Sequence, residues 1–182
     1  MQNAANSGVG RWVNHVAHMM GVNTINVIRD GVDRDSLLTT PDDIVVTESE
    51  LFGRKNDRLF KEMQISLGLN GVGGKSAYEI ARHLSEDGTL VTYGAMARQK
   101  MEMPNYLLIY KTLTFTGFNR TLWIEKSSRE KISDIYAELM AYAETHDPKV
   151  PISGVYALEA FQQALSHAAR SGRGGKILFK MD

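Results

Sequence analysis

Asn6-Ser7-Gly8-Val9-Gly10 and the later stretch Thr24-Ile25-Asn26-Val27-Ile28-Arg29-Asp30 decide the fold of this chain. After the first stretch, apolar residues recur at helical spacing as far as Gly21, which predicts an amphipathic helix beginning near Gly8. The second stretch is rich in β-branched residues and predicts a strand. Its acidic end, Asp30, lies 22 positions after Gly8, close to the offset of about 20 residues at which an acidic group meets the ribose in dinucleotide-binding βαβ units. Together these features predict a dinucleotide-binding site.

The first stretch is a variant of the G-x-G-x-x-G fingerprint rather than a strict match, because Asn6 and Ser7 stand where early glycines are usual. Small residues there would let the backbone approach a pyrophosphate, and the helix that follows would offer amide groups and a positive dipole end. The alternative is an ordinary turn that contains glycine.

The rest of the chain alternates strand and helix patterns. Further strands are predicted at 44–46, 65–70, 89–93, 112–118 and 177–179, and further helices at 56–63, 76–84, 129–145 and 158–170. Such alternation predicts an α/β fold with a Rossmann-type, doubly wound parallel sheet. We expect residues 1–182 to form a single dinucleotide-binding domain.

Composition restricts the function further. Across 182 residues, 21 Lys and Arg balance 21 Asp and Glu, and there is no Cys. A net charge of +0 argues against nucleic-acid and membrane-surface partners, which need a basic field. The lack of Cys excludes disulfides, thiolate metal sites and cysteine nucleophiles. No apolar run in the sequence approaches the length of about 20 residues that a membrane helix needs.

Met1 to Ala5 run directly into the glycine turn. They leave no room for a full buried strand, which usually has about five residues, before that turn begins. We therefore expect a truncated first strand, and a chain that is the carboxyl-terminal part of a larger protein, a shortened product or an isoform. The sequence shows no targeting segment ahead of the turn.

Arg29 and Asp30, at the tip of the predicted strand, bear on the choice of cofactor. Asp30 alone favours NAD, whose ribose carries a free 2′-hydroxyl, whereas Arg29 could pair with the 2′-phosphate of NADP. A charge-assisted hydrogen bond of roughly 1.5–3 kcal/mol would give a preference on the order of ten- to hundredfold. The alternative is a solvated surface arginine.

Two later glycine motifs follow predicted strands. Gly73-Gly74-Lys75-Ser76 does not fit a P-loop, since Leu69 stands where the motif needs its first glycine, so we expect a tight turn with Ser76 near a helix start. Tyr93-Gly94-Ala95-Met96 would lie beyond the carboxyl end of a strand, where ligands of parallel sheets bind. Tyr93 is then either a nicotinamide neighbour or an aromatic residue at the edge of the core.

The five histidines suggest no metal site. His15 and His18 fall on the expected solvent face of the first helix, and the others near helix ends, so all five are predicted to be surface residues. No Ser-His-Asp order or nucleophile elbow supports hydrolase chemistry.

Four blocks in combination resemble the mitochondrial trans-2-enoyl-CoA reductases, also called 2-enoyl thioester reductases, of the medium-chain dehydrogenase/reductase superfamily. The blocks are Gln2-Asn3-Ala4-Ala5-Asn6-Ser7-Gly8-Val9-Gly10, Val27-Ile28-Arg29-Asp30, Leu69-Asn70-Gly71-Val72-Gly73-Gly74-Lys75-Ser76 and Val91-Thr92-Tyr93-Gly94-Ala95-Met96. The resemblance covers almost the whole chain, but only the carboxyl-terminal, nucleotide-binding part of the family's.

The resemblance implies NADPH as cofactor and reduction of trans-2-enoyl thioesters of CoA or acyl carrier protein, in mitochondrial fatty acid synthesis. It implies cofactor-binding residues of four kinds: Asn6, Ser7, Gly8 and Val9 at the pyrophosphate; Arg29, Asp30 and Gly31 at the ribose phosphate; Tyr93, Gly94, Ala95 and Met96 at the nicotinamide; and Phe118, Asn119, Arg120 and Lys176 around the cofactor. Three of these depart from the family, which usually has arginine at Gly31, glycine at Ala95 and tryptophan at Asn119.

The resemblance also implies what this chain lacks. The family's catalytic tyrosine lies in an amino-terminal domain, so no catalytic residue and no metal ligand is assigned here, and residues 146–182 would return toward the position of that domain. It further implies a homodimer through the sheet edge at residues 112–118. We expect no turnover from this chain alone. Two alternatives stay open: a non-catalytic NADPH-binding or interaction module, and a quinone reductase of the same superfamily.

Overall fold

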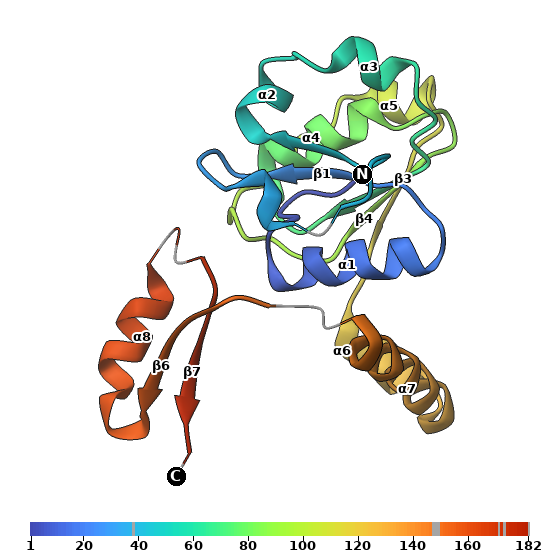
Figure 1. Ribbon diagram of the computed structural model, residues 1–182. Helices are drawn as coiled ribbons and strands as arrows, with labels where there is room; N and C mark the ends of the chain where they lie inside the picture. The colour runs from blue at the N-terminus through green and yellow to red at the C-terminus, as the bar shows by residue number, and fades with distance from the viewer. Residues whose placement is uncertain (38, 147–149, 171, 173, 182) are drawn as a thin grey trace. The chain divides into compact units, whose positions relative to one another are not determined.

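The computed structural model describes residues 1–37, 39–146, 150–170, 172 and 174–181 (Figure 1). They form two compact units, residues 1–140 and 141–182, each described here by itself.

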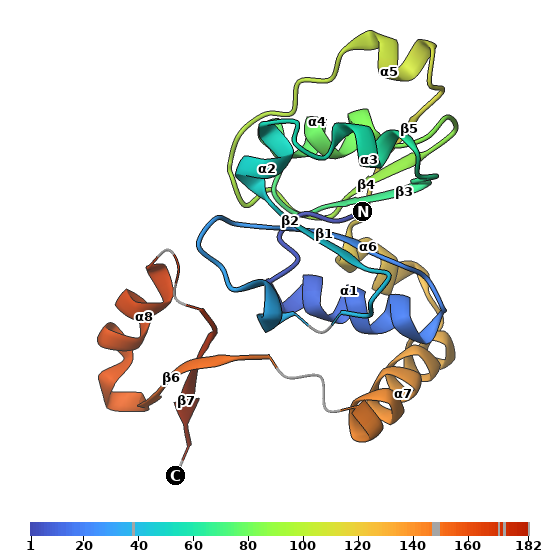
Figure 2. The same cartoon turned by 45° about the horizontal axis from the view of Figure 1, so that its top comes forward.

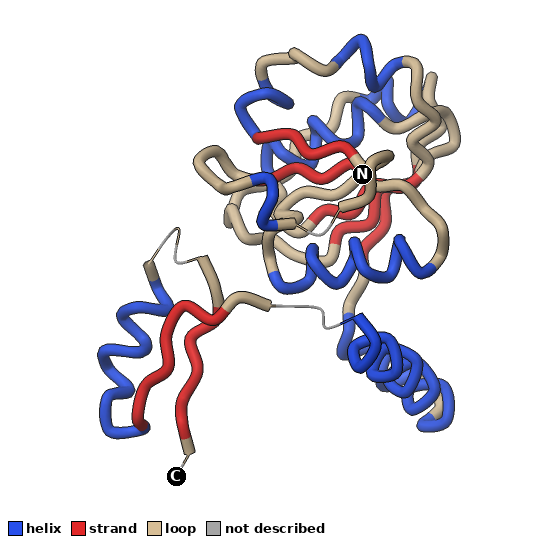
Figure 3. The backbone as a smooth tube through the Cα atoms, viewed as in Figure 1, coloured by secondary structure: helices blue, strands red, loops and turns tan. Residues whose placement is uncertain are grey.

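The first unit is built on parallel strands. These are β1 (Ile25–Ile28), β2 (Ile44–Thr47), β3 (Leu67–Asn70), β4 (Thr89–Thr92) and β5 (Thr114–Gly117). β1 pairs with β2, with Ile25 opposite Ile44, and β4 pairs with β3 on one side and β5 on the other. Figure 3 shows these strands in red between the helices of the unit.

The amino-terminal segment joins the two groups of strands. Gln2 forms parallel bridges to both Asn26 and Leu69. The amide of Gln2 donates to the Ile25 carbonyl at 2.8 Å, and the amide of Leu69 donates to the Met1 carbonyl at 2.9 Å. The order is therefore β2, β1, the segment around Gln2, β3, β4, β5, which is the Rossmann order. The predicted fold class is confirmed.

Helices cover both faces of this sheet (Figure 2). α1 (Gly8–Met19) lies on one face, and α2 (Glu48–Phe52), α3 (Asp57–Lys61), α4 (Gly74–His83) and α5 (Asn105–Ile109) lie on the other. The main core lies between the sheet and the second group, and includes Val27, Phe60, Ile80 and Leu90 at 1% exposure or less. α6 (Arg120–Lys126) and α7 (Arg129–His146) follow β5.

The second unit contains β6 (Ile152–Ala157), the 3₁₀ turn η2 (Leu158–Ala160), α8 (Phe161–Ala169) and β7 (Lys176–Lys180). β6 and β7 are parallel, with a register shift between Ile152 and Gly154. Of its described residues, only Tyr142 and Ala164 are buried. Many apolar side chains are exposed, namely Ile152, Val155, Leu158, Phe161, Leu165, Leu178 and Phe179.

The prediction of one domain over 1–182 stays a prediction, and residues 147–149, 171, 173 and 182 of that range lie outside the described residues. No helix in the described part of the chain is both long and apolar enough to cross a membrane.

Two of the histidines predicted to lie on the surface are buried, so that prediction was wrong for them. His15 is 5% exposed, and its ring makes an edge contact with Trp12. His83 is 8% exposed and packs edge-on against Phe60, because the last turn of α4 faces the core. Within the described residues, no group of three or more His, Asp or Glu side chains could hold a metal ion.

Buried His83 makes stability depend on pH. Burial lowers the pKa of His83 from 6.5 to about 4, so the unfolded chain binds the extra proton between those values. The stability contributed by neutral His83 is fully present above pH 6.5 and is lost as the pH falls toward 4, by on the order of 2–3 kcal/mol. Urea unfolding from pH 7 to pH 4 should show that loss, and His83→Gln should flatten it. A matched change at exposed His146, His146→Gln, should leave the slope unchanged; equal slopes for all three proteins would contradict the assignment.

Candidate nucleotide-binding site

The turn at the start of α1 has the geometry of an anion-binding turn. Ser7 is the N-cap, and its hydroxyl accepts from the amide of Gly10 at 3.1 Å. No acidic residue lies in the first helical turn, so its dipole is not neutralised there. Amides at the start of a helix have no partner within the helix and can donate to a phosphate. The predicted pyrophosphate residues, Asn6 to Val9, therefore form one continuous turn into the helix.

Gly10 allows α1 to lie very close to the amino-terminal segment. A Cβ built on Gly10 would lie 2.5 Å from the Ala4 carbonyl oxygen and 2.6 Å from the Ala5 Cα, and both of those atoms are backbone. Only glycine fits such a contact without moving the chain. This is the close helix–strand packing that the last glycine of the dinucleotide fingerprint provides.

Arg29, Asp30 and Gly31 lie exposed at the carboxyl end of β1, at the same edge of the sheet as the turn. The Ser49 hydroxyl donates to Asp30 Oδ1 at 2.5 Å, and this hydrogen bond lowers the pKa of Asp30. The carboxylate is therefore ionised and held in place by the first turn of α2. Gly31 has φ +78°, a left-handed conformation that favours glycine over arginine.

A buried amide network fixes the turn after β3, and sequence analysis missed it. Asn3 Nδ2 donates to Asn70 Oδ1 at 2.8 Å and to the Ser76 hydroxyl at 3.0 Å. Asn3 Oδ1 accepts from the Gly71 amide at 2.7 Å, and Asn70 Oδ1 accepts from the Gly73 amide at 2.9 Å. In the sequence, Asn70 stands at the end of a predicted strand and before Gly71, but nothing in the pattern points to Asn3 as its partner. The network joins the segment before the α1 turn to the start of α4.

A second cluster of amide side chains anchors the first turn of α1. Gln2 Nε2 lies 3.0 Å from the Gly10 carbonyl, 2.7 Å from Asn14 Oδ1 and 2.8 Å from Asn26 Oδ1. All three amide side chains are at most 2% exposed. Hydrogen bonds of this kind inside a protein hold their groups in one arrangement. The first turn of α1 is therefore anchored to the central segment and to β1.

Tyr93 packs over the glycine turn rather than standing free in the site. Its hydroxyl oxygen would lie 2.7 Å from a Cβ built on Gly71, so the ring covers that glycine. Burial raises the pKa of Tyr93, and its hydroxyl has no hydrogen-bond partner among the described residues. Gly94 approaches the Gly71 carbonyl as closely, since its own Cβ would lie 2.8 Å away. Beyond them Ala95 and Met96 are exposed.

Phe118, Asn119 and Arg120 follow β5 at the edge of the sheet. Phe118 is 47% exposed. Asn119 is the N-cap of α6 and accepts from the Leu122 amide at 3.2 Å, so its side chain has a structural partner. Arg120 Nη2 donates to the Tyr136 hydroxyl at 3.4 Å. Lys176, the last predicted cofactor residue, begins β7 in the second unit.

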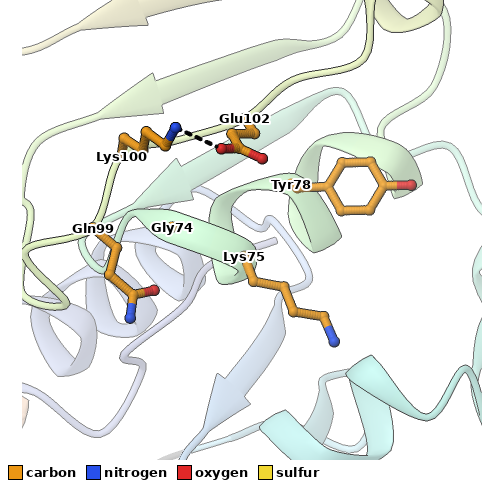
Figure 4. Close-up of a pocket in the computed structure, with 6 residues that line it drawn as sticks. All are labelled: Gly74, Lys75, Tyr78, Gln99, Lys100 and Glu102. Carbon is orange, nitrogen blue, oxygen red and sulfur yellow. Dashed lines mark ion pairs between the residues drawn. The ribbon is translucent and has the colours of Figure 1, made fainter.

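A cavity of about 520 Å³ lies at the start of α4 (Figure 4). It is lined by Gly74, Lys75, Tyr78, Gln99, Lys100 and Glu102. Lys100 pairs with Glu102 at 2.9 Å, and the Lys75 ammonium lies 4.6 Å from the centre of the Phe52 ring. Gly73 and Gly74 have φ of +84° and +54° and turn the chain into α4, as expected for a tight turn.

The strand order, the helix start at Gly8 and the acidic tip of β1 define the class: a Rossmann-type dinucleotide-binding fold. No protein-family model matches the chain.

Comparison with curated proteins shows which proteins this chain resembles. Mitochondrial enoyl-[acyl-carrier-protein] reductases match at 38% identity in Rattus norvegicus, over 91% of this chain and 46% of that protein. The Homo sapiens protein matches at 36%, over 100% of this chain and 50% of its own length. The resemblance inferred from the sequence blocks is confirmed: this chain is similar to mitochondrial enoyl-[acyl-carrier-protein] reductases, and it spans about half the length of the curated relatives it matches.

Comparison with solved structures gives the same resemblance. The mitochondrial 2-enoyl thioester reductase Etr1p/Etr2p heterodimer from Candida tropicalis has a TM-score of 0.76 at 27% identity, covering 92% of this chain and 50% of that one. A complex of Etr1p with NADP and crotonyl-CoA has a TM-score of 0.79 at 25% identity, over 99% of this chain and 53% of that one. A putative NADPH:quinone reductase from Bacillus thuringiensis has a TM-score of 0.83 over 97% of this chain and 54% of its own, but its 17% identity shows the fold alone.

Proposed function

We propose that this chain is the NADPH-binding part of an oxidoreductase that reduces trans-2-enoyl thioesters of CoA or acyl carrier protein in mitochondrial fatty acid synthesis. The observation that supports this most is the close contact of α1 with the central segment at Gly10, next to a helix start whose first turn carries no acidic residue. That geometry admits a pyrophosphate. The curated relatives are named mitochondrial enoyl-[acyl-carrier-protein] reductases, which supports the substrate class and the mitochondrial location.

The residues present fit the cofactor. The turn from Asn6 to Val9 would hold the pyrophosphate by backbone amides, and Arg29 with Asp30 would meet the adenosine ribose and its phosphate. Tyr93 to Met96 would line the nicotinamide end, and Phe118 to Arg120 would flank the cofactor. Lys176, which the sequence resemblance also implies as a cofactor residue, stays a prediction. When bound, NADPH supplies the hydride for reduction of the enoyl double bond. We assign no catalytic residue to this chain.

The exposed apolar side chains of the second unit bear on its role. A unit of two strands and a helix buries too little apolar surface to be stable alone. We propose that residues 146–182 pack against a further domain that carries the catalytic group, as the relatives' greater length allows.

We also propose dimerisation through residues 112–118. β5 pairs only with β4 among the described residues, and its outer edge is mostly exposed. An unpaired strand edge can pair with the same edge of a second copy. Assembly as a dimer is supported by the Etr1p/Etr2p heterodimer named above.

The function is tested with the purified 182-residue chain. We expect saturable NADPH binding by calorimetry, and no sustained oxidation of NADPH when crotonyl-CoA is added. Failure of well-folded protein to bind NADPH would contradict the proposed function. Sustained turnover would contradict our assignment of the catalytic group to a further domain. If the chain were combined with that further domain and still bound NADPH without turnover, the alternative of a non-catalytic interaction module would be favoured.

A further inference from the structure

Arg11 links the first helix to the segment that follows the tip of β1. It is the fourth residue of α1, directly after Gly10. Its Nη1 donates to the carbonyl oxygen of Ser36 at 2.5 Å. Ser36 ends the 3₁₀ turn η1 (Arg34–Ser36), which belongs to the same connection as Arg29, Asp30 and Gly31. The guanidinium therefore lies between the pyrophosphate turn and the β1–β2 connection.

Arg11 has a carbonyl oxygen as a hydrogen-bond partner but, among the described residues, no carboxylate. Its Nε is buried and has no hydrogen-bond partner among the described residues, and no carboxylate lies within ion-pair distance of it in that part of the chain. Burial lowers the pKa of Arg11. Other arginines of the same unit are paired: Arg34 contacts both carboxylate oxygens of Glu50 at 2.6 Å, and Arg82 pairs with Asp57 at 2.6 Å. A partly buried guanidinium with a spare donor is stabilised by an anion that reaches it.

We propose that Arg11 is a specificity-determining residue that donates to the adenosine 2′-phosphate of NADPH, as a second cation beside Arg29; this rests on the proposed function. Gly31 brings no side chain to that place, and a Cβ built on it meets nothing within 4 Å, so there is open space for the phosphate. A phosphate that carries close to two negative charges is held by one arginine less well than by two. Arg11 supplies the second charge from the helix instead of from the strand tip.

The test compares NADPH and NADH binding to the full chain with Arg11→Gln and Arg11→Lys. We expect Arg11→Gln to weaken NADPH binding by about 10- to 100-fold and NADH binding by less than about threefold, because only NADPH carries the 2′-phosphate. Arg11→Lys keeps the charge and the aliphatic stem, and should recover part of the NADPH affinity without recovering the geometry of a guanidinium. Arg58→Gln, on an arginine side chain that is 96% exposed in α3, is the matched control and should bind as the wild type does.

Each outcome separates two explanations. Unchanged NADPH affinity in Arg11→Gln would overturn the proposal while leaving the proposed function intact. An equal loss for NADPH and NADH would also overturn it, since it would place Arg11 at the pyrophosphate or in the structure of the turn. If the wild-type chain bound no NADPH, the proposed function itself would fail. If Arg11→Gln does not fold, the ratio of the NADPH and NADH affinities in Arg11→Lys decides, with an unchanged ratio overturning the proposal.

Discussion

Gly10→Ala is expected to destabilise the chain by about 2–3 kcal/mol, although alanine is the better helix former by about 1 kcal/mol. The added methyl group would lie 2.5 Å from the Ala4 carbonyl oxygen and 2.6 Å from the Ala5 Cα. Backbone cannot move aside as the end of a side chain can, so α1 must shift away from the central segment. Such a shift should also disturb the Gln2 contacts with Asn14 and the Gly10 carbonyl.

Urea unfolding followed by far-UV circular dichroism measures this loss. Gly117→Ala is the matched control, because its new Cβ would lie 3.8 Å from the Thr92 carbonyl oxygen, an ordinary contact. We expect that variant to stay within about 1 kcal/mol of the wild type. Equal unfolding midpoints for Gly10→Ala and wild type would mean that the close contact at Gly10 does not hold in solution.

Arg29→Ala is expected to weaken NADPH binding by about 10- to 100-fold and to leave NADH binding nearly unchanged. Arg29 is exposed at the tip of β1, next to the carboxylate of Asp30 that Ser49 holds. A 2′-phosphate at the ribose would accept from the guanidinium, whereas a 2′-hydroxyl needs only the carboxylate. Calorimetric titration of both coenzymes gives the two affinities directly.

Arg58→Ala serves as the control for charge, since Arg58 is highly exposed on α3. An equal loss of NADPH and NADH affinity in Arg29→Ala would remove the claim that Arg29 selects the phosphorylated coenzyme, without touching the claim that a dinucleotide binds.

Most strands, the helix α1 and the glycine turn before it were predictable from the sequence because local signals specify them. α1 was predicted from Gly8 to Gly21 and runs from Gly8 to Met19, with Ser7 as its cap. The strands β1 to β5 and the last strand β7 were expected close to where they lie. In each case apolar periodicity, β-branched residues and glycine turns agree.

Other elements were missed because their stability comes from contacts distant in sequence or from a single cap. α2 has five residues and depends on the capping box formed by Thr47 and Glu50. α5, α6 and β6 were missed as well, and β6 is broken by a register shift next to Gly154. Helices this short are unstable without tertiary packing, so periodicity does not reveal them.

The supports of the candidate site were also hidden from the sequence. The amide network of Asn3 and Asn70 joins residues 67 positions apart, and the ring of Tyr93 covers Gly71. The charge balance of Arg11 depends on which carboxylates surround it in space. Pattern and spacing carry none of that information, because it arises only when distant segments are folded together.

The segment around Gln2 is the junction between two groups of strands in the first unit. β1 with β2, and β3 with β4 and β5, are two separately paired groups of strands. Among the described residues, only the segment around Gln2 joins them, through backbone hydrogen bonds on both of its sides. If this short segment left the sheet, the edges of β1 and β3 that face it would both be exposed. The backbone amides and carbonyls along those two edges would then lose their hydrogen-bond partners. The exchange of the Val27 and Leu69 amides with solvent deuterium would therefore report directly on whether the two groups of strands are still joined.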